Sequence, residues 1–224
     1  MIGYSVNKRK RQVSAEMVSK FKEIPVANIS DVMSRIAAGG PNLRPMHKKG
    51  GLAGPAVTVK TRPGDNLMVH HAFNTASPGD VIVVDAGGDL TNAIVGELML
   101  SYAIMQKLAG VIIHGAVRDY SWINSNIFPV YAGGVTHRGP YKDGPGELNL
   151  PIALDGMVVE PGDLIVGDND GVLCIPFEQV DAVYKAAKAK NDVEQRSMDA
   201  VLKGTSDRSW VLASLKKGGC EFES

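Results

Sequence analysis

The chain has 224 residues, of which 44% are hydrophobic and 21% charged, so one domain with a substantial core and short terminal extensions is expected. Lys and Arg together number 24, as do Asp and Glu, which argues against a nucleic-acid partner because there is no overall positive field. The two cysteines are too few for a disulfide framework and fit a reducing cytoplasm, and no apolar run reaches the ~18 residues of a membrane span, so no membrane partner is expected.

The first part of the chain is expected to form an arm followed by helices. Residues 1–13 are interpreted as an arm or loose extension, whose basic run at residues 8–11 is solvated, with RNA contact as the alternative. Ser14 is a candidate N-cap for a helix that Pro25 breaks. A second helix is expected to begin with Asn28 or Ser30 as its cap, which puts Asp31 in its first turn. The main domain is then 14–203, with a tail at 204–224.

The centre of the chain predicts a strand–helix–strand unit from residue 81 to residue 119. Apolar runs at 56–60, 81–84 and 111–113 have the pattern of strands, and 66–73 suits a short helix. The stretch 96–109 is predicted to be a helix buried on most faces and ended by Gly110. Polar residues gather at the corners of this unit, where α/β proteins commonly bind ligands.

A short segment occurs twice, as Pro78-Gly79-Asp80 followed by an apolar strand and as Pro161-Gly162-Asp163 followed by another. Each copy predicts a turn that leads into a strand ending in Asp. Because the match covers only eight residues, it indicates reuse of a local device and not a repeat protein.

The second half predicts short elements and a long last helix. A helix or turn is expected at 122–127, strands at 128–131, 158–159, 164–166 and 172–175, and a functional or interfacial loop at 133–150, which is rich in Gly and Pro. Pro176 suits the first position of a helix over 177–203 with a charged second half. The last twenty residues, including Trp210, are expected to dock on a surface as a short helix. Cys174 is interpreted as a buried free thiol.

Two motifs carry a family resemblance: Gly96-Glu97-Leu98-Met99, and the run KLAGVIIHGAVRD at residues 107–119. Together they resemble the RraA-like family, over roughly residues 25–200. That family includes class II pyruvate aldolases acting on 4-hydroxy-4-methyl-2-oxoglutarate or 4-carboxy-4-hydroxy-2-oxoadipate, and a ribonuclease regulator. The resemblance implies a layered α/β/α sandwich of the swivelling β/β/α type, with a C-terminal helical extension. It also implies a homotrimer or dimer of trimers with active sites between subunits.

Arg118 and Asp119 suit an anion beside a cation, because the arginine fork binds carboxylates and Asp supplies the oxygen ligand that Mg²⁺ or Mn²⁺ prefers. Taken alone, the two residues favour a structural Arg–Asp pair that caps a turn. The resemblance implies that Arg118 binds the pyruvyl part of a substrate and that Asp119 ligates the metal. Gly96 allows close approach to a helix N-terminus, where the resemblance implies that the amides of Leu98 and Met99 hold the substrate carboxylate.

Three further acidic positions follow from the resemblance. Glu97 holds or activates the water that acts as base, although many aldolase members carry Asp there. Asp31 reaches a neighbouring subunit's site. Glu194 is the best match for an acid that a neighbouring subunit brings to the metal's water shell, with Asp192 and Asp199 as alternatives.

The predicted function is therefore a divalent-metal-dependent aldolase that releases pyruvate from a 4-hydroxy-2-oxo dicarboxylic or tricarboxylic acid, with oxaloacetate decarboxylation as a side activity. The alternative is a non-catalytic regulator that binds a ribonuclease or another protein; regulators of the family are shorter and generally lack the last helix. A methyltransferase is disfavoured, since no strand leads into a G-x-G-x-G loop.

Arg138 or Lys142 is a candidate for binding a distal carboxylate of the substrate. His70 and His71 are expected on a helix surface or in the core, His114 and His137 have no defined role, and Lys60 or Lys107 as a Schiff base is disfavoured.

Overall fold

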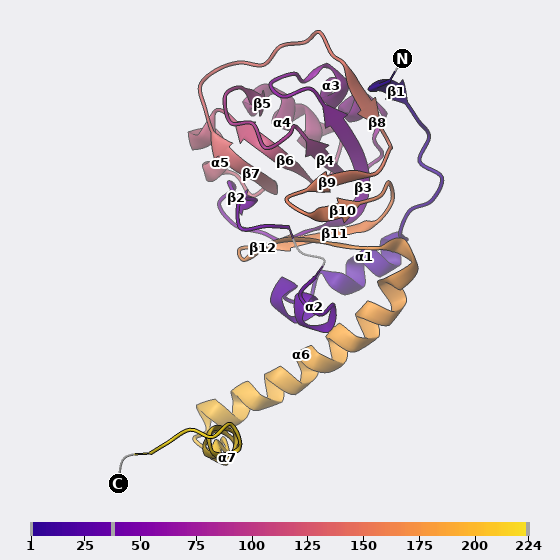
Figure 1. Cartoon of the computed structure of the whole chain (residues 1–224). Helices are drawn as coiled ribbons and strands as arrows, with labels where there is room; N and C mark the ends of the chain where they lie inside the picture. Colours follow the sequence, from indigo (N-terminus) through magenta and orange to yellow (C-terminus); the bar gives the residue numbers. More distant parts are fainter. Residues whose placement is uncertain (1, 37–38, 223–224) are drawn as a thin grey trace.

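The computed structural model describes residues 2–36 and 39–222. The domain is built in four layers, which are two helices, the main sheet, a second group of strands and a second group of helices (Figure 1). The layered α/β fold and the C-terminal helical extension predicted from the sequence are confirmed. Among the described helices, none is long and apolar enough to cross a membrane.

The elements follow one another from a short N-terminal strand to two C-terminal helices. The strands are β1 (Tyr4–Val6), β2 (Arg44–Pro45), β3 (Leu52–Thr61), β4 (Val81–Asp85), β5 (Ala93–Val95), β6 (Gly110–Val117), β7 (Val130–Val135), β8 (Gly146–Leu148), β9 (Ile152–Leu154), β10 (Met157–Val159), β11 (Leu164–Asp168) and β12 (Gly171–Ile175). The helices are α1 (Ala15–Phe21), α2 (Val26–Val32), α3 (Leu67–Thr75), α4 (Glu97–Met105), α5 (Tyr120–Ser125), the 3₁₀ turn η1 (Phe177–Gln179), α6 (Val180–Leu202) and α7 (Ser209–Lys217).

The main sheet has the strand order β1-β8-β3-β4-β6-β7-β2, and β5 pairs with the end of β6. Strands β3, β4, β6 and β7 are parallel to their neighbours, while β8 and β2 run antiparallel to β3 and β7. The main sheet is therefore mixed. Because β4 and β6 are parallel, their carboxyl ends lie at the same edge of the sheet, where ligand sites of α/β proteins gather.

The long strand β3 joins the two groups of strands. Its first half pairs with β11 of the second group, and its second half pairs with β4 and β8 of the main sheet. Three apolar clusters fill the spaces between the layers: α3 and α4 against the main sheet, the main sheet against β9 to β12, and β11 and β12 against α1, α2 and α6. Since side chains of a strand alternate between its two faces, the central strands β4, β6, β7, β11 and β12 each contribute to two of these clusters.

The two Pro-Gly-Asp turns have the same internal hydrogen bonds. The Asp80 carboxylate accepts a bond from the Ser77 N–H at 2.8 Å, and the Asp163 carboxylate accepts one from the Glu160 N–H at 3.0 Å. Both aspartates are buried. The prediction that the same local turn occurs twice is confirmed. One copy leads into β4 and the other leads into β11.

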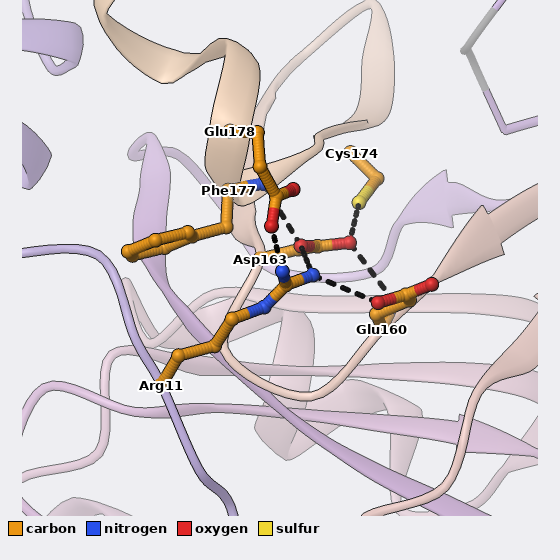
Figure 2. A network of polar contacts seen from close by, with 6 residues as sticks. All are labelled: Arg11, Glu160, Asp163, Cys174, Phe177 and Glu178. Carbon is orange, nitrogen blue, oxygen red and sulfur yellow. Dashed lines mark hydrogen bonds and ion pairs between the residues drawn. The ribbon is translucent and has the colours of Figure 1, made fainter.

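The N-terminal segment lies along the domain, with β1 paired to β8. Arg9 donates to both carboxylate oxygens of Asp80, at 2.8 and 3.1 Å. Arg11 contacts Glu160 at 2.8 Å and Asp163 at 3.6 Å, and it also pairs with Glu178 (Figure 2). The interpretation of the basic run as solvated is therefore wrong for Arg9 and Arg11, because each arginine binds the aspartate of one Pro-Gly-Asp turn.

The Asp163 end of this network also touches the first cysteine. The Cys174 Sγ lies 3.6 Å from Asp163 Oδ2 (Figure 2), and burial together with this carboxylate raises the pKa of the Cys174 thiol. Cys174 is thus the buried free thiol that the sequence predicted.

Two helices differ from their predicted bounds. The second helix begins at Val26, directly after Pro25, and Asn28 is buried with its amide bonded to Asn191 at 3.2 Å. The predicted caps were wrong, and Asp31 lies in the last turn of α2 instead of the first. Helix α4 ends at Met105, and Gly110 is the first residue of β6. Only one side of α4 is buried, which corrects the expectation of burial on most faces.

The C-terminal helices extend away from the domain (Figure 1). No residue of α6 after its middle residue, Asn191, is buried, and α7 has no buried residue. The short helix expected in the last twenty residues is confirmed as α7, but within the described residues it does not dock on the domain of its own chain. The predicted loop at 133–150 also contains the end of β7 and the strand β8, which α3 covers.

Candidate functional site

The two sequence motifs meet at the corner where β5 and β6 end. The Arg118 N–H donates to the Val95 carbonyl oxygen at 3.0 Å, directly before the start of α4 at Glu97. The strand pairing therefore brings Arg118 and Asp119 beside the N-terminus of α4. Two segments that are separated along the sequence form one polar corner.

Asp119 connects the end of β6 to the start of α4 at this corner. It has a left-handed backbone, with φ 59° and ψ 39°, which Asp adopts more readily than most residues. Its Oδ2 accepts a hydrogen bond from the Glu97 N–H at 2.9 Å and lies 3.7 Å from Arg118 Nε. The carboxylate thus satisfies one of the free amides at the start of α4 and sits beside the guanidinium. The side chains of Arg118 and Asp119 are each less than half exposed.

Gly96 is required by packing at this corner. A Cβ at this position would lie 2.3 Å from Asp119 Oδ2 and 2.9 Å from Arg118 Cγ, both shorter than real contacts. From the sequence, Gly96 was expected to allow the close approach of an anion to the helix N-terminus. The structure adds that the space beside it is already taken by the two charged side chains.

The first turn of α4 presents open backbone donors. The Glu97 N–H is bonded to Asp119, whereas the N–H groups of Leu98 and Met99 have no acceptor within residues 2–36 and 39–222. A helix N-terminus carries a partial positive charge, so these two amides favour an anion. Leu98 is 84% exposed and lines a cavity, so the start of α4 is open to a ligand.

A cavity of about 190 Å³ opens at this corner. Its charged lining residues are both cations, Arg118 from the end of β6 and Lys142 from the loop before β8. Its floor comes from β5 and the start of α4, and its far wall comes from α3. The full lining is Asn66, His70, Ile94, Val95, Gly96, Leu98, Met99, Arg118, Gly139, Pro140 and Lys142. Two cations and open amides make this cavity suited to an anion with two acidic groups.

Sequence reasoning missed two polar lining residues, Asn66 and His70. His70 was expected on a helix surface or in the core, yet it lines the cavity, where burial and the nearby Lys142 charge lower its pKa. Asn66 precedes α3 and is 2% exposed. The sequence signal for this wall was indirect and came from the Gly- and Pro-rich loop at 133–150, which is expected to be functional or interfacial.

The predicted acidic residues Asp31 and Glu194 lie elsewhere, together. Lys190 joins them, at 3.0 Å from Asp31 and 2.6 Å from Glu194, and Arg35 pairs with Asp31 at 2.7 Å. The hydrogen bond from Lys190 and the charge of Arg35 lower the pKa of Asp31. Helices α2 and α6 lie on the side of the domain away from α4 (Figure 1), so one chain does not bring this cluster to Arg118. Of the alternatives, Asp192 pairs with Lys188 at 2.6 Å.

Asp119 is the best placed carboxylate for a metal at the cavity corner. Within the described part of the chain, no group of three or more His, Cys, Asp or Glu residues is arranged to hold a metal. Mg²⁺ retains several waters and commonly uses only one or two protein carboxylates together with substrate oxygens. A single carboxylate beside an anion cavity fits that kind of site, and it does not fit a closed cage of protein ligands.

Comparisons with known proteins agree with one another. The family model described as RraA-like, Aldolase/RraA, matches residues 26–174. A protein of Halalkalibacterium halodurans with the provisional name 4-hydroxy-4-methyl-2-oxoglutarate aldolase is 40% identical over 179 residues, which are 80% of this chain and 85% of the relative. An uncharacterized protein from Pseudomonas syringae superposes with a TM-score of 0.78 at 23% identity, covering 87% of this chain and 96% of the other. The RNA-processing inhibitor RraA from Thermus thermophilis superposes with a TM-score of 0.64 at 29% identity, covering 69% and 93%.

Proposed function

Because the chain belongs to the Aldolase/RraA family, we propose that it is a divalent-metal-dependent aldolase. Its substrate would be a 4-hydroxy-2-oxo dicarboxylic or tricarboxylic acid, cleaved to pyruvate and a second oxo acid. The observation that carries the proposal is the convergence of Arg118 and two open α4 amides on one cavity, with the Asp119 carboxylate directly beside Arg118 and the start of α4. Oxaloacetate decarboxylation is the expected side activity, since it passes through the same pyruvate enolate.

Arg118 and the start of α4 bind the pyruvyl end of the substrate. The guanidinium offers two parallel donors to a carboxylate or 2-oxo acid. The amides of Leu98 and Met99 add donors that a carboxylate satisfies without rearranging the helix. Gly96 leaves room for the Arg118 and Asp119 side chains beside these amides. These donors favour the negative charge that develops on the enolate oxygen as the C3–C4 bond breaks.

Asp119 would hold the metal, Mg²⁺ or Mn²⁺. When bound, such an ion supplies Lewis-acid stabilisation of charge on the 2-oxo oxygen. The Glu97 N–H keeps the Asp119 carboxylate turned toward the corner, and the outer-shell acid would be Glu194 of a neighbouring subunit. Glu97 holds the water that receives the proton of the 4-hydroxyl group, helped by Asp31 of a neighbour.

We further propose assembly as a homotrimer or a dimer of trimers, in which neighbours complete each site. Asp31 and Glu194 lie together on the side of the chain away from its own Arg118, and the second half of α6 carries exposed apolar residues, among them Val193, Met198 and Val201. Both features support a shared site.

Mixing Arg118→Ala subunits with Glu194→Gln subunits tests the shared site, because mixed assemblies would regain activity that neither variant has alone. No recovery after dissociation and reassembly would argue against sharing.

The decisive experiment is pyruvate release from 4-hydroxy-4-methyl-2-oxoglutarate, 4-carboxy-4-hydroxy-2-oxoadipate and oxaloacetate, with Mg²⁺ and with EDTA. We expect release that needs the metal and that Arg118→Ala removes. No release from any of the three would instead favour the second candidate, a regulator that binds a ribonuclease or another protein. That candidate is supported by the likeness to the RNA-processing inhibitor.

A further inference from the structure

The cavity contains one buried acceptor without a partner. Asn66 is 2% exposed, and its Oδ1 has no hydrogen-bond partner within the described residues. Folded proteins leave few buried polar atoms unpaired, and those that remain often belong to binding sites. Asn66 also lines the cavity that Arg118 lines. A ligand in this cavity therefore has an unused acceptor to satisfy.

The orientation of the Asn66 amide is fixed by its other end. Its Nδ2 donates to the Ile94 carbonyl oxygen at 2.8 Å and lies 3.3 Å from Met99 Sδ, both of which only accept. A flipped amide would set two acceptors against each other. The free atom is consequently the oxygen, and the group that satisfies it must be a hydrogen-bond donor.

The loop that carries Lys142 is anchored beside Asn66. The Asn66 N–H donates to the Tyr141 carbonyl oxygen at 3.0 Å. The fully buried Asp65 carboxylate accepts the N–H groups of Asp143 at 2.8 Å and Gly144 at 2.9 Å. Lys142 is therefore held between two fixed points, with its charge at the cavity. Arg138, the other cation of this loop, is not among the lining residues.

We propose that Asn66 and Lys142 form the subsite for the far end of the substrate, with Asn66 Oδ1 accepting a hydrogen bond from the 4-hydroxyl group and Lys142 binding the second carboxylate. The inference rests on the proposed function only in assigning the 2-oxo end to Arg118. It selects Lys142 over Arg138 as the cation for the distal carboxylate.

The two groups divide the recognition between them. A carboxylate at neutral pH only accepts, so it satisfies Lys142 and leaves Asn66 unpaired. A hydroxyl group donates to Asn66 and is the only donor on a hydroxy-oxo dicarboxylate. Because an amide oxygen is not a base, Asn66 binds and orients the hydroxyl. Rotation about the C4–O bond then turns the proton toward the water on Glu97.

Binding of uncleavable ligands tests the subsite. Reduction of the 2-oxo group removes the electron sink for cleavage, so 2,4-dihydroxyglutarate and 2-hydroxyglutarate form a pair that differs only in the 4-hydroxyl. Lactate, which lacks the far end, is the third ligand. Calorimetry with Mg²⁺ should show that the wild-type protein binds the dihydroxy compound about tenfold more tightly than 2-hydroxyglutarate. Equal affinity in the wild-type protein would overturn the role of Asn66 without any variant.

Variants then separate the two residues. Asn66→Ala should remove the preference for the 4-hydroxyl, and a melting temperature together with lactate binding reports whether the site is still folded. Lys142→Met changes an exposed loop residue and should weaken both dicarboxylates by about tenfold while lactate is little affected. Arg138→Met is the matched control. Equal losses with Arg138→Met, or a retained hydroxyl preference in Asn66→Ala, would contradict the proposal.

The outcome is independent of the aldolase assay. If the ligand pattern appears but no 2-oxo acid yields pyruvate, the subsite stands and the proposed function fails. If pyruvate is released but the 4-hydroxyl gives no advantage in binding, the aldolase stands and the assignment of Asn66 fails.

Discussion

Gly96 and Asp119 are packed so closely that a Cβ on residue 96 would lie 2.3 Å from Asp119 Oδ2. The same Oδ2 accepts the Glu97 N–H at 2.9 Å. The two motifs of this corner are therefore parts of one tightly fitted arrangement, in which the glycine is required by the position of the carboxylate. Any side chain at position 96 displaces the group that we propose holds the metal.

Gly96→Ala is expected to reduce kcat/KM for pyruvate release by about a hundredfold, because a displacement near 1 Å at a reacting centre commonly has this effect. The displaced groups are half-exposed side chains, so the melting temperature should change little. Gly51→Ala is the matched control, since a Cβ there would lie 3.5 Å from the Gly167 oxygen, an ordinary contact. Activity of Gly96→Ala equal to that of Gly51→Ala would contradict this account of the corner.

Arg118→Lys is expected to lose most of the activity although the charge is kept. Lysine has no planar fork, so it cannot give two parallel hydrogen bonds to the 2-oxo acid. Loss of one such electrostatic donor commonly costs about 3 kcal/mol of transition-state stabilisation, or about a hundredfold in kcat. Steady-state kinetics on the best of the three substrates would measure this. A change confined to KM would mean that Arg118 binds substrate and transition state equally.

The sequence was sufficient for the corner and for much of the fold because both depend on local patterns. Apolar runs predicted β4 and β6, and the Pro-Gly-Asp turns predicted the same hydrogen-bonded device in two places. The proximity of Gly96 to Arg118 was implied by the motifs together. Each of these features is determined by residues close together in the chain, or by a single strand–helix–strand connection.

Contacts between distant segments could not be predicted in the same way. Nothing local to Arg9 indicates that it pairs with Asp80, or that Tyr141 accepts a bond from the Asn66 N–H. The polar pattern of the N-terminal run is the same whether its charges are solvated or paired. The subsite around Asn66 was missed for this reason, since its buried oxygen is defined by a strand, a helix and a loop that meet only in the folded chain.

Arg9→Met is expected to destabilise the domain by about 3 kcal/mol, because breaking a buried ion pair leaves an uncompensated charge. The remaining carboxylate is Asp80, which is 2% exposed, while the Arg9 side chain is 14% exposed. Urea unfolding would measure the loss. Lys10→Met changes an exposed neighbour in the same segment and should stay within about 0.5 kcal/mol of the wild type. The double variant Arg9→Met, Asp80→Asn should recover part of the loss; no recovery would mean that packing of the arginine matters more than its charge.

Lys142→Met is expected to raise the pKa of His70 toward its ordinary value of 6.5 without reaching it. Burial is the larger cause of the lowered pKa and remains in the variant, while the repulsion from the Lys142 charge is removed. The folded state binds His70's proton less readily than the unfolded chain, so this histidine's contribution favours unfolding as the pH falls below 6.5 and disappears above it. NMR titration of the His70 ring protons measures the pKa directly. No change in Lys142→Met, or an equal change in Arg138→Met, would show that the Lys142 charge does not face His70 across the cavity.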